Sequence, residues 1–100
     1  MYVGDVASVN LWLLDHPAVS GVFNVGTGAS ASFNDVARAI IAGLSKGAIR
    51  YIPFPPELAA SYQSFTQADI SALRTAGYGA PFKDVRVGIA SYLDALRSWP

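Results

Sequence analysis

Residues 21–47 read GVFNVGTGASASFNDVARAIIAGLSKG, and the spacing of apolar residues changes part-way along this stretch. The first five residues are rich in β-forming side chains and run into Gly26 and Gly28, which predicts a short buried strand entering a tight turn. Apolar residues then recur every three or four positions, as in an amphipathic helix with Ser32 as its N-cap and Gly47 at its end. The stripe of this helix contains Phe33, Val36, Ala37, Ile40, Ile41 and Leu44.

The segment before this stretch predicts the end of a strand and one helix. Residues 1–4 are short and apolar, and Asp5 occupies a position typical of a helix N-cap. Apolar residues lie on more than one side of the helix expected over 5–15, which indicates burial on several faces. Pro17 ends this helix because the residue before a proline is disfavoured in the helical region.

The segment after it predicts another strand and a short helix. Residues 49–52 have the composition of a strand, and the prolines within 53–56 stop it because proline cannot continue a ladder of hydrogen bonds. Thr66 and Asp69 form a variant of the capping box, which predicts a short helix over 68–75.

A final helix is expected after Asp84, its N-cap, and should end near Trp99. Together these patterns predict an α/β fold with about four helices and two or three short strands, in the order β, α, β, α, β, α, α. So few strands cannot form a complete Rossmann sheet. We therefore expect the chain to be part of a larger α/β protein.

The composition of the 100-residue chain limits its possible partners. It fits one domain at most. Seven basic and seven acidic residues give a formal net charge of zero, which provides no attraction for nucleic acid or for an anionic membrane. Without Cys, and with a single His, the chain has no disulfide and no convincing set of metal ligands. No segment resembles a membrane span or a secretion signal, so we expect a cytoplasmic location.

The surface that this composition implies is short of charge. Charged residues make up 14% of the chain, whereas about 25% is usual. Because small monomers need charged exteriors, part of this surface is expected to be covered by more of the same protein or by a partner. We therefore expect the isolated chain to form a homo-oligomer, the alternative being a small Ala-rich domain with few ions.

The glycines at 26 and 28 resemble an incomplete dinucleotide-binding motif. They follow an expected strand and precede a helix, where a backbone free of side chains can approach a pyrophosphate. However, Ala31 stands where the motif has its third glycine, and no acidic residue follows about 20 positions later at the end of a strand. A simple turn that begins a helix is the preferred interpretation, and no cofactor-binding residue is predicted.

Catalysis by this chain alone has little support in its sequence. His16, the only His, stands beside Pro17 at a helix end, where it is expected to cap carbonyl groups rather than act as a base. No Tyr is followed by a Lys four positions later, the spacing at which an ammonium group would promote ionisation of a phenol. No catalytic residue is therefore predicted.

The loop 61–69 is the best candidate for ligand binding. It reads SYQSFTQAD and places an aromatic hydroxyl, two carboxamides and several hydroxyls just before an expected helix N-terminus. Such groups suit a phosphate or a sugar oxygen. In the alternative interpretation, Thr66 and Asp69 only cap the helix, while Tyr62 and Phe65 hold the loop in place.

Two motifs resemble a known family. The runs YVGDVA at 2–7 and FNVGTG at 23–28 resemble the C-terminal part of extended short-chain dehydrogenases, the NAD-dependent epimerase/dehydratase family, whose members act on nucleotide sugars. More specific runs resemble the ADP-heptose 6-epimerases within that family. These runs are YIPFP at 51–55, YQSFTQADI at 62–70, LR at 73–74, AGY at 76–78 and PFK at 81–83. The resemblance covers most of the chain but only the last third of such an enzyme.

This resemblance implies a parent enzyme that uses NADP to invert carbon 6 of an ADP-heptose for the inner core of lipopolysaccharide. Hydride leaves that carbon to give a transient carbonyl and returns to the other face. The family's cofactor loop and its catalytic Tyr and Lys lie upstream of the matching part, so this chain, 1–100, would be the C-terminal substrate-binding portion and inactive alone. Tyr62 matches a family tyrosine that binds the nucleotide sugar, and Gln63 is a weaker neighbouring candidate.

Two alternatives remain open at this point. One keeps the fold and changes the sugar, as in another nucleotide-sugar epimerase or dehydratase. The other is a free-standing interaction module whose charge-poor faces bind a partner protein and no sugar.

Overall fold

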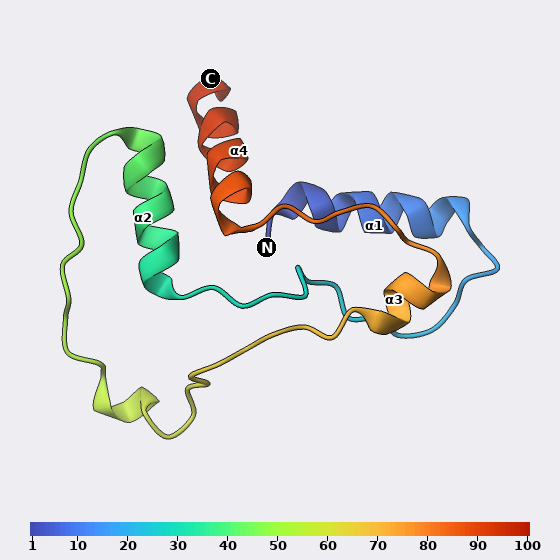
Figure 1. Cartoon of the computed structure of the whole chain (residues 1–100), viewed down its shortest axis with the longest axis horizontal. Coiled ribbons are helices and arrows are strands. Elements are labelled where there is room, and N and C mark those ends of the chain that lie inside the picture. Colours follow the sequence, from blue (N-terminus) through green and yellow to red (C-terminus); the bar gives the residue numbers. More distant parts are fainter.

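A computed structural model describes all residues, 1–100, and consists of helices joined by long loops (Figure 1). Two helices, α2 and α4, stand side by side, while α1 runs across the molecule towards the short α3. The elements are α1 (Val3–Asp15), α2 (Phe33–Leu44), the 3-10 turn η1 (Pro56–Leu58), α3 (Ser71–Ala76) and α4 (Val85–Ser98).

The boundaries of α2 follow from local hydrogen bonds. The Ser32 hydroxyl oxygen accepts from the Asp35 N–H at 3.1 Å, and the Asp35 carboxylate accepts from the Ser32 N–H at 3.0 Å. This is a complete capping box, so the predicted N-cap is confirmed. The helix ends at Ser45, which adopts the left-handed conformation.

The packing of α2 on α4 depends on a close approach at Gly43. A Cβ added at Gly43 would lie 2.5 Å from a Leu93 methyl carbon, so any larger residue there would force the Leu93 side chain to move. Arg97 of α4 also donates a hydrogen bond to the Gly43 carbonyl. The predicted cap of α4 is confirmed, because the Asp84 carboxylate accepts from the Val87 N–H at 2.9 Å.

A second cluster joins α1 to α3. Its buried apolar residues are Val9, Leu73 and Tyr78. Gly77, in the left-handed conformation with φ +118°, ends α3 and turns the chain so that Tyr78 enters this cluster. The partly buried residues around it are Trp12, Leu13, Phe23, Val25 and Phe82.

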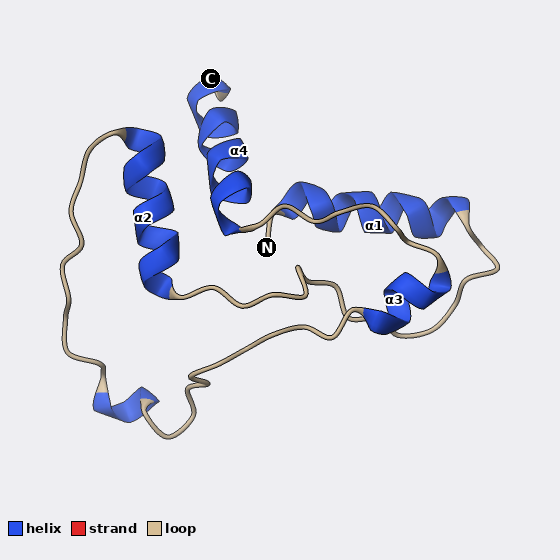
Figure 2. Cartoon of the chain, in the orientation of Figure 1, coloured by secondary structure: helices blue, strands red, loops and turns tan.

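The predicted strands are wrong, because the chain contains helices and loops and no strand (Figure 2). Residues 1–4 lead into the first turn of α1, and 21–25 and 49–52 belong to no ladder. A strand needs a neighbouring backbone to bond with, and high β-propensity reflects packing on such a neighbour rather than an intrinsic preference. Neither segment has one in this chain, and Val22 is 97% exposed. The α/β class is therefore corrected to a helical one, although the expected four helices are present.

Two predicted helix starts are also corrected. The helix α1 begins at Val3, and the Asp5 carboxylate accepts from the Lys83 N–H at 2.8 Å instead of capping the helix. The helix α3 begins at Ser71 rather than at 68, because Thr66 and Asp69 form no capping box. The Thr66 hydroxyl donates to a Gln63 carboxamide oxygen at 3.1 Å instead.

Much of the chain's surface stays open to solvent. Its accessible area is 7683 Å², whereas a compact chain of this mass exposes about 5,400 Å². Its radius of gyration is 16.6 Å, compared with about 13 Å for a compact domain of 100 residues. The chain thus leaves about 2,300 Å² more surface exposed than a domain with one closed core. None of its helices combines the length and apolarity that crossing a membrane requires.

Acid is expected to weaken the start of α2. The N–H and the hydroxyl of Ser32 bond to Asp35 and hold the pKa of that carboxyl below its ordinary value of 3.8. A carboxyl whose pKa is lower in the folded chain contributes stability above its unfolded pKa, and this contribution is lost as pH falls through the folded pKa. We expect an NMR titration to give Asp35 a midpoint below 3.8, with the amide shifts of the first α2 turn following it. In Asp35→Asn those amide shifts should no longer follow an acid titration, and a midpoint at or above the ordinary value would contradict the prediction.

Candidate functional site

The loop 59–70 is held at two places, and the first is an aromatic contact. The Tyr62 ring meets the Phe54 ring edge-on, with the ring centres 5.2 Å apart, and lies 6.3 Å from the ring of Phe33. Phe33 is the first residue of α2, and nearby the Tyr51 hydroxyl donates to the Asn34 side chain at 3.3 Å. The loop is therefore anchored beside the N-terminus of α2.

The second anchor joins the loop to the glycine turn. The Gln67 carboxamide donates to the Gly28 carbonyl oxygen at 2.9 Å. A Cβ added at Gly26 would lie 2.5 Å from the Ala68 Cβ, and one added at Gly28 would lie 3.2 Å from an Ile70 methyl carbon. Gly28 also has φ +76°, a conformation that glycine adopts without strain.

These contacts explain why the chain has glycine at both positions. The side chains of Ala68 and Ile70 lie where a Cβ at Gly26 or Gly28 would stand. The structural role of these glycines is to let 67–70 pass close to the turn.

The two predicted substrate residues lie next to each other in sequence but differ in their bonding. Tyr62 is 48% exposed, and its hydroxyl makes no hydrogen bond within the chain. Gln63 is exposed, and its carboxamide oxygen already accepts from Thr66. Tyr62 thus presents an unused phenol group on a ring that is fixed by its aromatic neighbours.

Asp69 and Gln67 are polar residues of the loop that the sequence interpretation did not single out as site residues. The hydroxyl and the N–H of Ser71 hold the pKa of Asp69 below its usual range, and the N–H bond to the carboxylate measures 3.0 Å. Both residues line a cavity of about 460 Å³ together with Gly28, Ala68, Ile70 and Ser71. The contact of Gln67 with Gly28 joins positions 39 residues apart, a separation at which no local pattern gives a signal.

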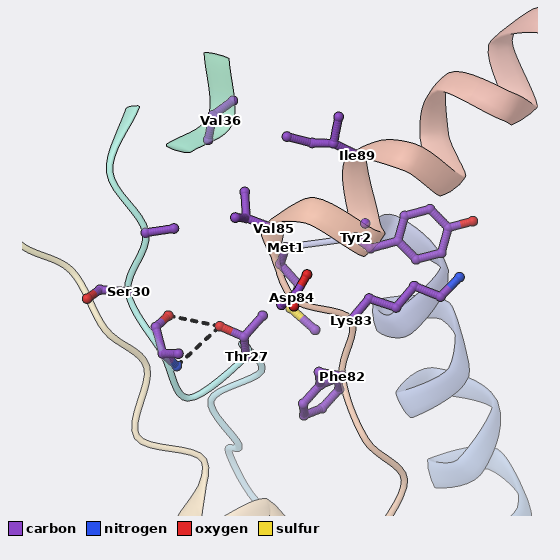
Figure 3. Close-up of a pocket in the computed structure, with 13 residues that line it drawn as sticks. Met1, Tyr2, Thr27, Ser30, Val36, Phe82, Lys83, Asp84, Val85 and Ile89 are labelled. Carbon is purple, nitrogen blue, oxygen red and sulfur yellow. Dashed lines mark hydrogen bonds between the residues drawn. The ribbon is translucent and has the colours of Figure 1, made fainter. Parts of the chain in front are cut away.

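A second cavity, of about 510 Å³, lies between the loop of residues 27–31 and the start of α4, beside the N-terminus of the chain (Figure 3). Thr27 and Ser30 line one side of it, and Phe82 and Lys83 line the other. The Lys83 ammonium group stands 4.3 Å from the centre of the Tyr2 ring and donates to the Ser91 hydroxyl at 3.0 Å. Its charge is therefore already engaged. Neither this cavity nor the previous one is lined by Tyr62 or Gln63.

The single His has the capping role predicted for it. His16 Nδ1 lies 2.7 Å from the Trp12 carbonyl oxygen, one turn earlier in α1, and its ring stacks on the Trp12 ring at 4.3 Å between centres. No group of three or more His, Cys, Asp or Glu side chains is placed to hold a metal ion.

Comparison with known proteins supplies a relative for the whole chain. No family model matches the sequence. The chain is 50% identical over 98 residues to an ADP-L-glycero-D-manno-heptose-6-epimerase from Alkalilimnicola ehrlichii. It resembles part of a heptose epimerase. The match covers 98% of this chain and 31% of the relative, so the chain spans about a third of that protein's length. The resemblance predicted from the sequence runs is thereby confirmed.

The match to a heptose epimerase extends over almost the whole chain. Because it covers 98% of the chain, it takes in nearly all of the helices and loops described above. The prolines, the aromatic residues and the loop 59–70 are therefore features of a segment that is similar to one third of a larger protein, rather than of an unrelated small domain.

The close approach of loop and turn is expected to depend on Gly26. In Gly26→Ala the added methyl group would collide with Ala68, which should reduce the free energy of unfolding by about 1–3 kcal/mol, as overpacking does. Gly79→Ala is the matched control, because nothing lies within 4 Å of a Cβ added there. Urea unfolding followed by fluorescence of Trp12, which packs against the α1–α3 cluster, measures both. Equal midpoints for the two variants would show that the turn and loop are not in contact.

Proposed function

We propose that this chain is the C-terminal, sugar-side part of an ADP-heptose 6-epimerase, which interconverts ADP-D-glycero- and ADP-L-glycero-D-manno-heptose for lipopolysaccharide synthesis in the cytoplasm. The observation that carries the proposal is the 50% identity to the heptose epimerase over 98 residues. It favours this sugar over those of other nucleotide-sugar epimerases and dehydratases. It also argues against a free-standing interaction module.

Within that enzyme, Tyr62 is the residue we assign to the nucleotide sugar. Its hydroxyl is unpaired, so it can donate to a phosphate or sugar oxygen and accept from a sugar hydroxyl. Its ring is held between Phe54 and Phe33, so little side-chain freedom is lost when a ligand binds. Gln63 is the secondary candidate, and its amide N–H groups remain available for a ligand.

The chemistry itself needs groups from the rest of the parent. NADP, when bound by the parent's N-terminal domain, supplies the hydride acceptor for carbon 6. The residues of this chain contribute binding and orientation of the sugar and no acid or base, because no Tyr–Lys pair is present. This proposal places the parent's cofactor site outside this chain, which matches 31% of the relative.

The isolated chain is expected to show no epimerase turnover. Mixed with NADP and ADP-D-glycero-D-manno-heptose, it lacks the groups that would remove and return the hydride. Separation of the two epimers by anion-exchange chromatography gives the readout. Turnover above that of buffer would contradict the proposal that the groups needed for hydride transfer lie in the rest of the parent.

A chimeric enzyme tests the sugar-binding role directly. We expect the Alkalilimnicola ehrlichii enzyme to remain active when this chain replaces its corresponding third. In that chimera, Tyr62→Phe should raise KM roughly threefold to tenfold, the effect of losing one hydrogen bond to the ligand.

Tyr92→Phe is the matched control for the Tyr62 measurement. Tyr92 is exposed to a similar extent, and its hydroxyl also makes no hydrogen bond within the chain. Its removal should leave KM unchanged. A folded chimera that does not epimerise the heptose would overturn the proposed function, whereas an active chimera with unchanged KM in Tyr62→Phe would remove only the role of Tyr62.

A further inference from the structure

The ring of Phe54 is the nearest aromatic neighbour of the Tyr62 ring. The two ring centres are 5.2 Å apart and the ring planes meet at 71°, an edge-to-face geometry within the favourable range for aromatic pairs. The other neighbour, Phe33, stands farther away, at 6.3 Å between ring centres, and is 76% exposed. No hydrogen bond within the chain restrains the Tyr62 side chain. The direction of its hydroxyl therefore depends on these ring contacts, and most on Phe54.

The backbone that carries the Phe54 ring is stiff on both sides. Phe54 stands between Pro53 and Pro55. The ring of a proline fixes its own φ, and the residue before a proline is disfavoured in the helical region. Phe54 therefore has few alternative backbone conformations, and little entropy is lost when its ring is held in one place.

The segment that contains Phe54 is also tied to a helix. The Tyr51 hydroxyl donates to the Asn34 side-chain oxygen at 3.3 Å. Asn34 lies in the first turn of α2, whose backbone is fixed by the capping box. Phe54 thus belongs to a stiff segment anchored on α2, whereas Tyr62 belongs to the loop 59–70. The contact between the two rings passes the position of the helix on to the loop.

We propose that Phe54 is a positioning residue for the nucleotide sugar and acts through Tyr62 rather than by touching the ligand. The Phe54 side chain has no polar atom with which to bond a phosphate or a sugar hydroxyl. By holding the Tyr62 ring, it keeps the phenol hydroxyl in one place before the ligand arrives, so less side-chain freedom is lost on binding. This inference rests on the role proposed for Tyr62 in the parent enzyme.

A double-mutant cycle in the chimeric enzyme tests the coupling between the two residues. Phe54→Leu removes the ring contact and should raise KM roughly threefold. The value of kcat should not change, because a contact made equally in the ground state and the transition state affects KM alone. Once Tyr62→Phe has removed the hydroxyl, adding Phe54→Leu should raise KM no further.

Two further variants separate the ring contact from general effects on the fold. Phe54→Tyr keeps the ring, and because Phe54 is half exposed there is room for the added hydroxyl. This variant should keep the KM of the unmodified chimera. Tyr92→Leu is the matched control, since it removes a ring of α4 that is 52% exposed and pairs with no other ring. It should leave KM unchanged.

The cycle distinguishes failure of this inference from failure of the proposed role of Tyr62. An additive rise of KM in the double variant would overturn the inference, because Phe54 would then act on the ligand or on the fold without Tyr62. An unchanged KM in Phe54→Leu, with a raised KM in Tyr62→Phe, would overturn the inference alone. An unchanged KM in Tyr62→Phe would overturn both.

NMR of the 100-residue chain tests the restraint on Tyr62 without any enzyme activity. Three-bond couplings should report a single χ1 rotamer of Tyr62 in the wild-type chain and in Phe54→Tyr, and averaged rotamers in Phe54→Leu. Unchanged amide shifts in α1 and α3 would show that each variant keeps its fold. Averaged couplings in the wild-type chain, or a single rotamer retained in Phe54→Leu, would overturn the inference whatever the activity of the chimera.

Discussion

The close passage of residues 67–70 across the glycine turn is the contact on which the arrangement of the candidate site depends. Gly26 has room for no side chain because Ala68 lies against it, and Gln67 bonds to the Gly28 carbonyl. The two segments come from distant parts of the sequence, and the long excursion between them contains α2, η1 and Tyr62. Without this contact the loop would be held only at its aromatic end. The glycines that resemble part of a cofactor motif thus serve packing within the chain.

Helix caps and ends, which depend on residues a few positions apart, could be predicted from the sequence. Strands, which need a partner from a distant part of the chain, could not. Ser32 and Asp84 bond to N–H groups three residues away, and Gly77 ends a helix by its own conformation, so each is visible in a short window. The segments 21–25 and 49–52 have the composition of strands but no neighbouring backbone to pair with. Thr66 and Asp69 have the spacing of a capping box, yet they bond to Gln63 and Ser71 instead.

In the candidate site, too, one residue could be predicted from its neighbours in sequence, while the contacts that hold it could not. Tyr62 could be singled out because it stands in a characteristic run of residues, and the comparison supports the family of that run. The rings that hold Tyr62, Phe33 and Phe54, belong to other segments. Nothing in the sequence pairs them with it. The role of Gln67 as an anchor likewise depends on a carbonyl in the turn and becomes visible only in three dimensions.

The bond between the Lys83 N–H and the Asp5 carboxylate joins residues 78 positions apart. Leu73 and Tyr78, which pack with Val9 of α1 in the buried cluster, also come much later in the sequence than α1. During synthesis, α1 is therefore made well before the residues of this chain that pack on it. Contacts of such long sequence separation slow folding because the loop must close before they contribute. Until Leu73 and Tyr78 follow, α1 lacks its apolar partners in this chain, a state in which chaperones bind exposed apolar surface.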